Sequence, residues 1–150
     1  MPFEFSFTDE QEKFRRDVRD FIHSEILPTI SKYDKLEEFP SENVSKMAEQ
    51  GYFGLTVPEK YGGKGLSKIN YGILLEELSA ICASHGTILG AHLGLCITPI
   101  ILFGTEEQKN KLFDIKSKIH SWLVDRTISN DIIVEFDAAE LTNDNFKFLT

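Results

Sequence analysis

Residues 87–103 read TILGAHLGLCITPIILF, and the uncharged stretch around them, 78–105, contains no aspartate, glutamate, lysine or arginine. Its length would allow it to cross a membrane as a helix. Gly86, Gly90 and Gly94 add to that possibility, because small residues four positions apart are typical of paired membrane helices. A membrane-spanning helix is therefore one interpretation of this stretch.

Polar residues within and around the same stretch favour the other interpretation, a helix buried in a protein core. Ser84, His85 and His92 interrupt the apolar run, both flanks are rich in glutamate, and no basic cluster sets an orientation across a membrane. A helix that is apolar on every face is expected at the centre of a bundle. We therefore expect a core helix and no membrane span.

Helix-start signals on both sides of this stretch predict further helices with short links. Thr8-Asp9-Glu10-Gln11 and Thr105-Glu106-Glu107-Gln108 are capping boxes, in which a threonine and a glutamine satisfy each other's backbone N–H groups. Pro28 should end or kink the first helix, while Ser41 and Ser67 are the expected N-caps of the second and third. The predicted inner faces comprise Phe14, Val18, Phe21, Ile22 and Ile26 in the first helix, Val44, Met47 and Ala48 in the second, and Ile69, Ile73, Leu74, Leu78, Ile81 and Cys82 in the third.

Glycine and proline residues predict where these helices end. Gly51 should stop the second helix in the left-handed conformation, and Pro99 should break the uncharged helix, with Thr98 capping its last piece. Residues 52–66 show neither helical nor strand periodicity and indicate a loop. Within it, Gly62-Gly63-Lys64-Gly65 could suggest a phosphate loop, but no strand precedes it and the Walker spacing is missing, so we expect a turn.

The sequence changes character after Phe113. Residues 115–123 suggest one more helical stretch, 131–136 (DIIVEF) resemble a strand, and the last residues have no clear period. We therefore predict an all-α fold, an antiparallel bundle of about five helices. The predicted domain comprises residues 1–113, and an irregular tail comprises 114–150.

Composition excludes several classes of protein. The 150 residues contain 16 Lys and Arg against 24 Asp and Glu, a net charge of −8, so the chain lacks the positive field that nucleic-acid binding requires. The only cysteines, Cys82 and Cys96, fit free thiols in a reducing compartment. Because the N-terminus has no basic region typical of a secretory signal, we expect the cytoplasm.

Taken together and in this order, several motifs resemble the N-terminal helical domain of the acyl-CoA dehydrogenases. They are FTDEQ (7–11), EILP (25–28), MAEQGYFGL (47–55), VPEKYGGKGL (57–66), LEEL (75–78) and FGTEEQK (103–109). Each motif alone is weak, but the order and spacing are specific. The resemblance covers residues 3–111 and implies a helical bundle that is not a membrane protein.

The resemblance implies chemistry that depends on other parts of that family's chain. The family oxidises the Cα–Cβ bond of acyl-CoA thioesters, with a glutamate as base and FAD as hydride acceptor. Its FAD signature, LTEP…GSD, lies in a middle β-domain, and its glutamate lies in a C-terminal helical domain. Here residues 112–115 are LFDI and residues 141–145 are LTNDN, which match neither the approach to that signature nor the signature itself. We therefore expect FAD at the level of the family, but no FAD binding and no catalytic residue in this chain alone.

The same resemblance names candidates for contact with an acyl chain. By position, Thr87, Ile88, Ala91 and Leu95 would face the substrate channel, with His92 as a further candidate. The alternative, which we favour from the sequence, is that they are ordinary core residues. The four histidines show no ligand-like spacing, so we predict no metal site. Glu76 and Glu77 are adjacent on a helix and point to different sides, so we expect a solvent-exposed flank with one residue capping or pairing, not an acid–base pair.

The leading interpretation is therefore a truncated N-terminal domain of an acyl-CoA dehydrogenase-like flavoprotein, inactive alone, with acyl-CoA as the substrate that the resemblance implies. Two alternatives remain open: a non-catalytic helical module that binds a protein, and one half of a split dehydrogenase whose flavin domain is a separate chain. Apolar surface near residues 87–101 should stay exposed and favour self-association. Aspartate at Leu93 or Ile100 should change that behaviour.

Overall fold

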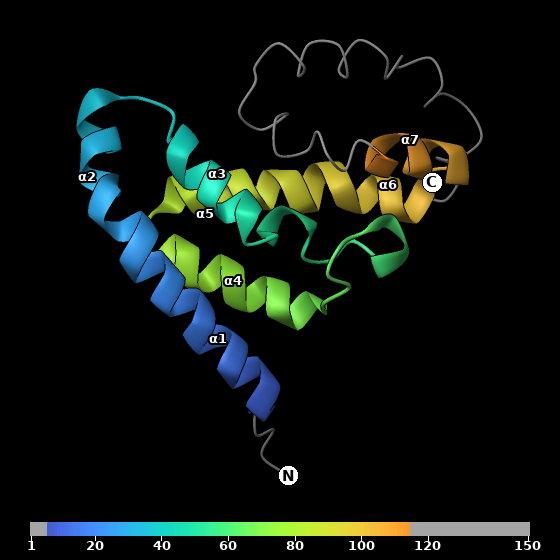
Figure 1. Cartoon of the computed structure of the whole chain (residues 1–150), viewed down its shortest axis with the longest axis horizontal. Helices are drawn as coiled ribbons and strands as arrows, with labels where there is room; N and C mark the ends of the chain where they lie inside the picture. Colours follow the sequence, from blue (N-terminus) through green and yellow to red (C-terminus); the bar gives the residue numbers. More distant parts are fainter. Residues whose placement is uncertain (1–5, 115–150) are drawn as a thin grey trace, which may run out of the picture.

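The computed structural model describes residues 6–114 and the side chains of residues 6–110. The predicted all-α fold is confirmed: these residues form helices and no strand (Figure 1). The elements are α1 (Asp9–Phe21), the π-helix η1 (Ile22–Ile26), α2 (Leu27–Leu36), α3 (Ser41–Glu49), the 3₁₀ turns η2 (Tyr52–Gly54) and η3 (Glu59–Tyr61), α4 (Lys68–Ile81), α5 (Ala83–Gly90), the π-helix η4 (Ala91–Ile97), α6 (Thr98–Phe103) and α7 (Glu106–Asp114). The expected helix at 115–123 and strand at 131–136 lie outside the described residues.

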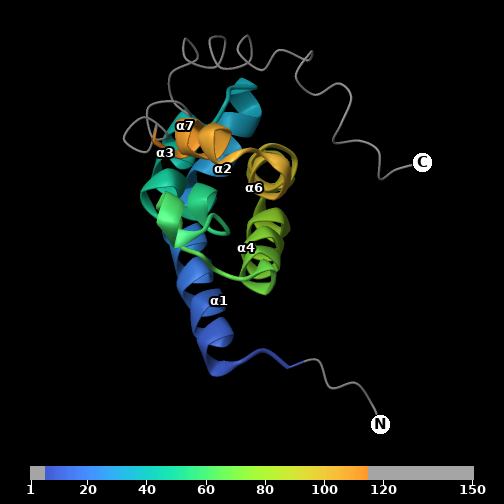
Figure 2. The same ribbon diagram turned by 90° about the vertical axis from the view of Figure 1, so that its right-hand side faces the viewer.

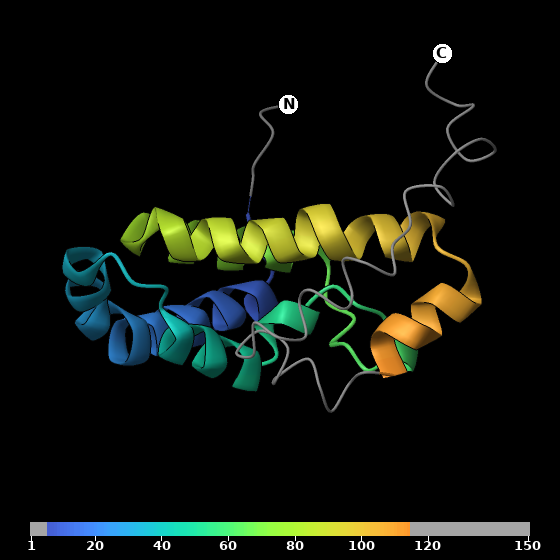
Figure 3. The ribbon, with the colours of Figure 1, turned by 90° about the horizontal axis from the view of Figure 1, so that it is seen from above.

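The helices form two sides of a small bundle. Seen from above, α5, η4 and α6 form one long rod on one side, and α1, α2 and α3 lie opposite (Figure 3). α4 packs against both α1 and α5 and so joins the two sides (Figure 2). The apolar core between them consists of Val18, Ile22, Ile26, Val44, Met47, Tyr52, Phe53, Leu55, Val57, Tyr61, Leu74, Leu78, Leu89, Leu93 and Ile97.

The glycines at every fourth position of the rod lie against α4 of the same chain. A Cβ at Gly94 would lie 3.7 Å from the Tyr71 hydroxyl oxygen, and a Cβ at Gly90 would lie 3.8 Å from both that oxygen and the Leu75 Cδ1. Further along, Gly86 lies against Ser79. The residue numbers on α4 fall as those on the rod rise, so the two helices pair antiparallel, and the glycines allow the close approach.

Gly86→Ala should therefore weaken this helix pair. The new Cβ would overlap the Ser79 hydroxyl and lie 3.1 Å from the Ser79 Cβ and 3.3 Å from its Cα, so rotation of the hydroxyl alone cannot make room. We expect a loss of about 1–2 kcal/mol in the free energy of unfolding, measured by urea denaturation. Gly72→Ala is the matched control. No atom lies within 4 Å of its Cβ position, so that helix-favouring change should stabilise the protein by about 1 kcal/mol. Equal losses at both sites would show that space at Gly86 does not matter.

The two prolines predicted to interrupt helices are accommodated without a break. Pro28 lies in the first turn of α2, directly after the π-helix η1, and Pro99 lies in the first turn of α6, directly after the π-helix η4. Proline cannot donate an N–H, and the wider π turn rearranges the ladder where that donor is missing. The predicted break at Pro99 is wrong. Thr98 is helical and does not cap, because its hydroxyl donates to the Leu93 carbonyl at 2.6 Å.

Most of the predicted helix ends are confirmed. Thr8 and Thr105 form capping boxes, and the Ser67 hydroxyl accepts from the Asn70 N–H. Gly51 has the predicted left-handed φ of 70°. Ser41 was assigned wrongly: it is the first helical residue, and the buried Pro40 precedes it at the cap position.

Two burial predictions are also wrong. Ile69, expected on the inner face of α4, is 53% exposed because it lies in the first turn of that helix, before the strongly buried positions begin. The uncharged rod, expected at the centre, lies at one side of the described bundle (Figure 3). Its glycines meet α4, and Leu89, Leu93 and Ile97 meet the core. The remaining faces of an apolar helix are therefore open.

Candidate functional site

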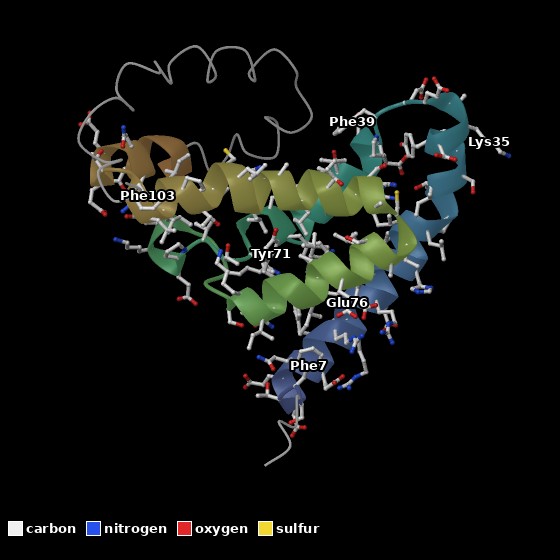
Figure 4. The ribbon with its side chains drawn as sticks, turned by 180° about the vertical axis from the view of Figure 1, so that it is seen from behind. Phe7, Lys35, Phe39, Tyr71, Glu76 and Phe103 are labelled. Carbon is white, nitrogen blue, oxygen red and sulfur yellow. The ribbon has the colours of Figure 1, made fainter. Side chains whose placement is uncertain are left out.

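The open side of the rod carries a continuous apolar stripe. It consists of Thr87, Ala91, Leu95, Pro99 and Leu102, all exposed, with Phe103 beside Leu102. Leu95 is 80% exposed, Leu102 65% and Phe103 71%. Figure 4 shows Phe103 at the far end of the rod and Tyr71 between α4 and the rod. Large exposed side chains in one uncharged line are typical of a surface that another partner covers. We call this set the apolar stripe.

The length of the rod also meets the criterion for a membrane span. Residues 83–103 form a 21-residue helical run. An 18-residue window within it has a mean hydropathy of 1.8, and 28% of that window is buried. Core helices of proteins without a membrane segment satisfy the same criterion, so length and composition alone do not distinguish a core helix from a membrane span. The packing of Gly86, Gly90 and Gly94 on α4 shows that this glycine face is already in use within the chain.

The structure brings three of the four predicted channel residues together. Thr87, Ala91 and Leu95 lie on the apolar stripe, one helical turn apart, while Ile88 is partly buried and packs on the core. Thr87, Ala91 and Leu95 are exposed and are therefore not core residues of the described bundle, whereas Ile88 fits that alternative. Their contact with an acyl chain remains a prediction. Leu93, which we expected at the surface, is 0% exposed and belongs to the core.

His92 faces the interior, away from the stripe. Its ring packs edge-on against Phe53, with centroids 5.1 Å apart. Burial lowers the pKa of His92 to about 4, although a hydrogen bond to the Phe53 backbone partly opposes that change. His92 is therefore neutral near pH 7 and fixes η4 to η2, which makes it a structural residue.

The glycine-rich loop has no free amides for a phosphate. The N–H groups of Gly62, Gly63, Lys64 and Gly65 all donate to backbone carbonyls of the chain, at 2.7–3.3 Å. The predicted turn is thus confirmed, with Gly62 and Gly65 at φ of 80° and 62°. A pyrophosphate-containing cofactor such as FAD finds no cradle in this loop. Among the described residues, no group of three or more His, Cys, Asp or Glu side chains could hold a metal ion.

Comparison with known proteins shows which family has this sequence and this arrangement of helices. Residues 8–114 match the family model described as acyl-CoA dehydrogenase, N-terminal domain. The chain belongs to the acyl-CoA dehydrogenase family. It is 44% identical over 108 residues to a short-chain specific acyl-CoA dehydrogenase of Clostridium acetobutylicum, which covers 72% of this chain and 28% of that enzyme. It is 39% identical over 103 residues to the mitochondrial short-chain enzyme of Bos taurus, covering 69% of this chain and 25% of that enzyme.

Solved structures of the family have the same fold. Butyryl-CoA dehydrogenase from Megasphaera elsdenii superposes with a TM-score of 0.69 at 32% identity, covering 75% of this chain and 30% of that one. The glutaryl-coenzyme A dehydrogenase in its glutaryl-CoA complex gives 0.68 at 30% identity, covering 75% and 29%. The chain therefore spans about a quarter to a third of the length of the acyl-CoA dehydrogenases it matches.

Two of the motifs quoted above, residues 57–66 and residues 103–109, meet at one contact. The Tyr61 hydroxyl, from the loop motif, donates to Glu106 Oε2 at 2.6 Å, and Glu106 stands in the first turn of α7. Lys60 and Lys109 lie 3.4 Å and 3.3 Å from the same carboxylate. The Tyr61 hydrogen bond and the two lysines lower the pKa of Glu106. The contact holds the loop to the start of α7 and fixes the corner where Leu102 and Phe103 are exposed.

A second contact joins α1 to α4 and was only partly predicted. Glu77 is 8% exposed, and its carboxylate accepts from Arg15 Nε at 2.6 Å and from Arg19 Nη2 and Nε at 2.7 Å and 2.9 Å. The adjacent Glu76 is exposed beside α1 (Figure 4). Glu76 fits the predicted solvent-exposed flank. Glu77 does not, because its carboxylate is buried and paired with two arginines.

Proposed function

We propose that this chain is the N-terminal helical domain of an FAD-dependent acyl-CoA dehydrogenase, and that the apolar stripe forms one wall of its acyl-chain site. The observation that carries the proposal is the stripe itself, because Thr87, Ala91 and Leu95 are the positions that the family resemblance indicates. The stripe holds no charge, so it would exclude water and counter-ions from an acyl chain lying on it. We also propose that the protein is located in the cytoplasm and that the helical domain ends at residue 113, with residues 114–150 as a tail outside it.

The described residues supply a binding wall and no base. No carboxylate lies on the rod, and Glu77 is held by two arginines and is not free to accept a proton. The amides of the glycine-rich loop are occupied, so FAD is not assigned to this chain. Within the proposal, proton removal and hydride transfer depend on the middle and C-terminal domains of the family, which this sequence does not match. A 150-residue polypeptide with this sequence should therefore be colourless and should not oxidise acyl-CoA alone.

A chimeric enzyme tests the proposal. Residues 8–114 replace the matched segment of the Clostridium acetobutylicum enzyme, and flavin content and acyl-CoA oxidation are measured. We expect a flavin-loaded, active chimera. Leu95→Asp in that chimera should lower kcat/KM about 100-fold, because it buries a carboxylate beside the acyl chain. Leu36→Asp, at a leucine 53% exposed on α2, is the matched control and should change kcat/KM less than about twofold.

The outcomes separate the alternatives. A folded chimera that retains flavin but tolerates Leu95→Asp would contradict the stripe as an acyl wall. A chimera without flavin would favour the helical binding module. Activity that appears when the 150-residue polypeptide is mixed with a second polypeptide carrying the flavin and C-terminal domains would identify one half of a split enzyme.

A further inference from the structure

A buried polar cluster joins three helices on the side of the bundle remote from the loop. His85 of α5 is 2% exposed and Asn43 of α3 is 0% exposed. Asn43 Nδ2 lies 3.0 Å from His85 Nε2, and the Thr29 hydroxyl of α2 lies 2.9 Å from Asn43 Oδ1. Sequence analysis predicted none of these contacts. Buried polar groups of this kind lower the stability of the fold unless their hydrogen bonds are made.

The geometry requires a neutral histidine. Asn43 Nδ2 is the atom that lies 3.0 Å from His85 Nε2, and an amide nitrogen can only donate, so Nε2 is the acceptor. The Thr29 hydroxyl lies 2.9 Å from both Asn43 Oδ1 and the Ile26 carbonyl oxygen, and its one hydrogen is shared between these two acceptors. A ring nitrogen accepts only when it carries no proton. The other nitrogen, Nδ1, is buried with no hydrogen-bond partner among the described residues. A second proton on this ring would therefore remove the bond to Asn43 and leave a buried charge.

We propose that Thr29, Asn43 and His85 form an acid-sensitive joint, which holds α2 and α3 to α5 while His85 is neutral and opens when His85 takes up a proton. α2 has no fully buried residue of its own, so it depends on η1 and on this joint for its position. The corner of α2 and α3 should open before the rest of the bundle.

Within residues 6–110, no carboxylate is hydrogen-bonded to His85, so a proton on its ring would gain no direct ion pair there. The titratable groups on the elements around His85 belong to α2, α3, α4, η1 and η4. They are Lys32, Tyr33, Asp34 and Lys35 on α2, Glu42, Lys46 and Glu49 on α3, Lys68, Tyr71, Glu76, Glu77 and the adjacent Cys82 on α4, His23 and Glu25 on η1, and His92 and Cys96 on η4. Lys46 is paired with Glu25 and Glu42, and Glu77 with its arginines. None of these groups is hydrogen-bonded to His85.

The sign of the pH dependence follows from burial. Burial lowers the pKa of His85 from its ordinary 6.5. As pH falls below that value, the unfolded chain takes up a proton that the folded chain does not, so stability decreases with falling pH. His92 contributes with the same sign, and a residue-specific measurement is therefore needed to isolate His85.

The test uses the full 150-residue chain and nitrogen-15 NMR of the histidine rings. We expect His85 to be neutral, with its proton on Nδ1, and to titrate below the ordinary histidine pKa of 6.5. Backbone signals of α2 and α3 should change with the same midpoint, while those of α1 should not. His85→Gln, which keeps an acceptor for Asn43, should make the melting temperature less dependent on pH by roughly 5 °C between about pH 7 and about pH 5. His23→Gln is the matched control and should leave that dependence unchanged.

Asn43→Asp reverses the sign and separates the joint from simple burial. A carboxylate in place of the amide, about 3 Å from Nε2, favours the imidazolium, so His85 should then titrate above its ordinary pKa. If this variant does not fold, the proposal is still tested by the NMR titration of the unmodified chain and by the pH dependence of the melting temperature of His85→Gln. His85 titrating at or above its ordinary pKa in the unmodified chain would overturn the proposal, as would equal pH profiles of that chain and His85→Gln.

Discussion

Glu77→Ala should lower the free energy of unfolding by about 3 kcal/mol, whereas Glu76→Ala, one residue earlier, should cost less than about 0.5 kcal/mol. The Glu77 side chain is 10% exposed and accepts three hydrogen bonds from Arg15 and Arg19, while the Glu76 side chain is 62% exposed and makes one long contact of 3.6 Å. Removing Glu77 takes away the carboxylate that both guanidinium groups bind at the α1–α4 contact and leaves Arg15 only its 3.6 Å contact with Glu76. Urea denaturation of both variants measures the difference.

The pH dependence of the same pair gives an independent measurement. Hydrogen bonds from Arg19 and then Arg15 lower the pKa of Glu77 below its ordinary 4.5, against the opposing effect of burial. Its contribution is therefore complete above that pKa and is lost as pH falls through the lower folded value. Glu77→Gln keeps the shape and should remove this part of the acid sensitivity. Equal losses for the Glu76 and Glu77 variants would contradict the assignment of the α1–α4 contact to Glu77.

The position of Glu77 could have been predicted from helical periodicity. It lies four residues after Ile73 and three after Leu74, on the buried face of α4. Arg15 and Arg19 are also four residues apart and so share a face of α1. Adjacency predicts that Glu76 and Glu77 point to different sides of α4, but only the spacing from Ile73 and Leu74 indicates which of the two is buried. By contrast, the contact between Asn43 and His85 joins residues 42 positions apart, and no local pattern indicates it.

Local chemistry explains which predictions succeeded. Thr8, Ser67 and Thr105 cap helices through bonds to residues three positions away, so the sequence contains both partners. Ser41 has the same side-chain chemistry, but Pro40 already occupies the cap position, and the choice between them depends on how the chain enters α3. The predicted helices are therefore confirmed more reliably than their exact first residues.

The uncharged rod shows the limit of the argument from composition. An apolar helix indicates that most of its faces become buried, but not which surface buries them. In residues 6–114 the glycine face packs on α4, and the side with Leu95 and Leu102 remains exposed. Two leucines two positions apart, Leu93 and Leu95, consequently have opposite environments, at 0% and 80% exposure.

That contrast gives the prediction with the largest expected effect. Leu93→Asp should unfold the domain, because a carboxylate in the core without a partner costs more than about 4 kcal/mol. Leu95→Asp should keep the melting temperature within a few degrees, because its carboxylate reaches water. It should also reduce binding of a hydrophobic dye and self-association of the 150-residue chain, because it places a charge in the middle of the apolar stripe. Circular dichroism, dye fluorescence and light scattering measure the three quantities.

Leu102→Asp extends the test to the other end of the stripe, where Leu102 is 65% exposed. If the stripe acts as one surface, Leu95→Asp and Leu102→Asp should each lower self-association, and the double variant should lower it further. A wild-type chain that is already monomeric and negative for the dye at tens of micromolar would contradict an open stripe and would indicate that residues outside 6–114 cover it. A Leu93→Asp protein that stays folded would contradict the core assignment of Leu93. With Leu93→Asp unfolded and Leu95→Asp folded but less associated, the side of the rod that carries Leu95 would be the surface available for contact with the rest of an acyl-CoA dehydrogenase.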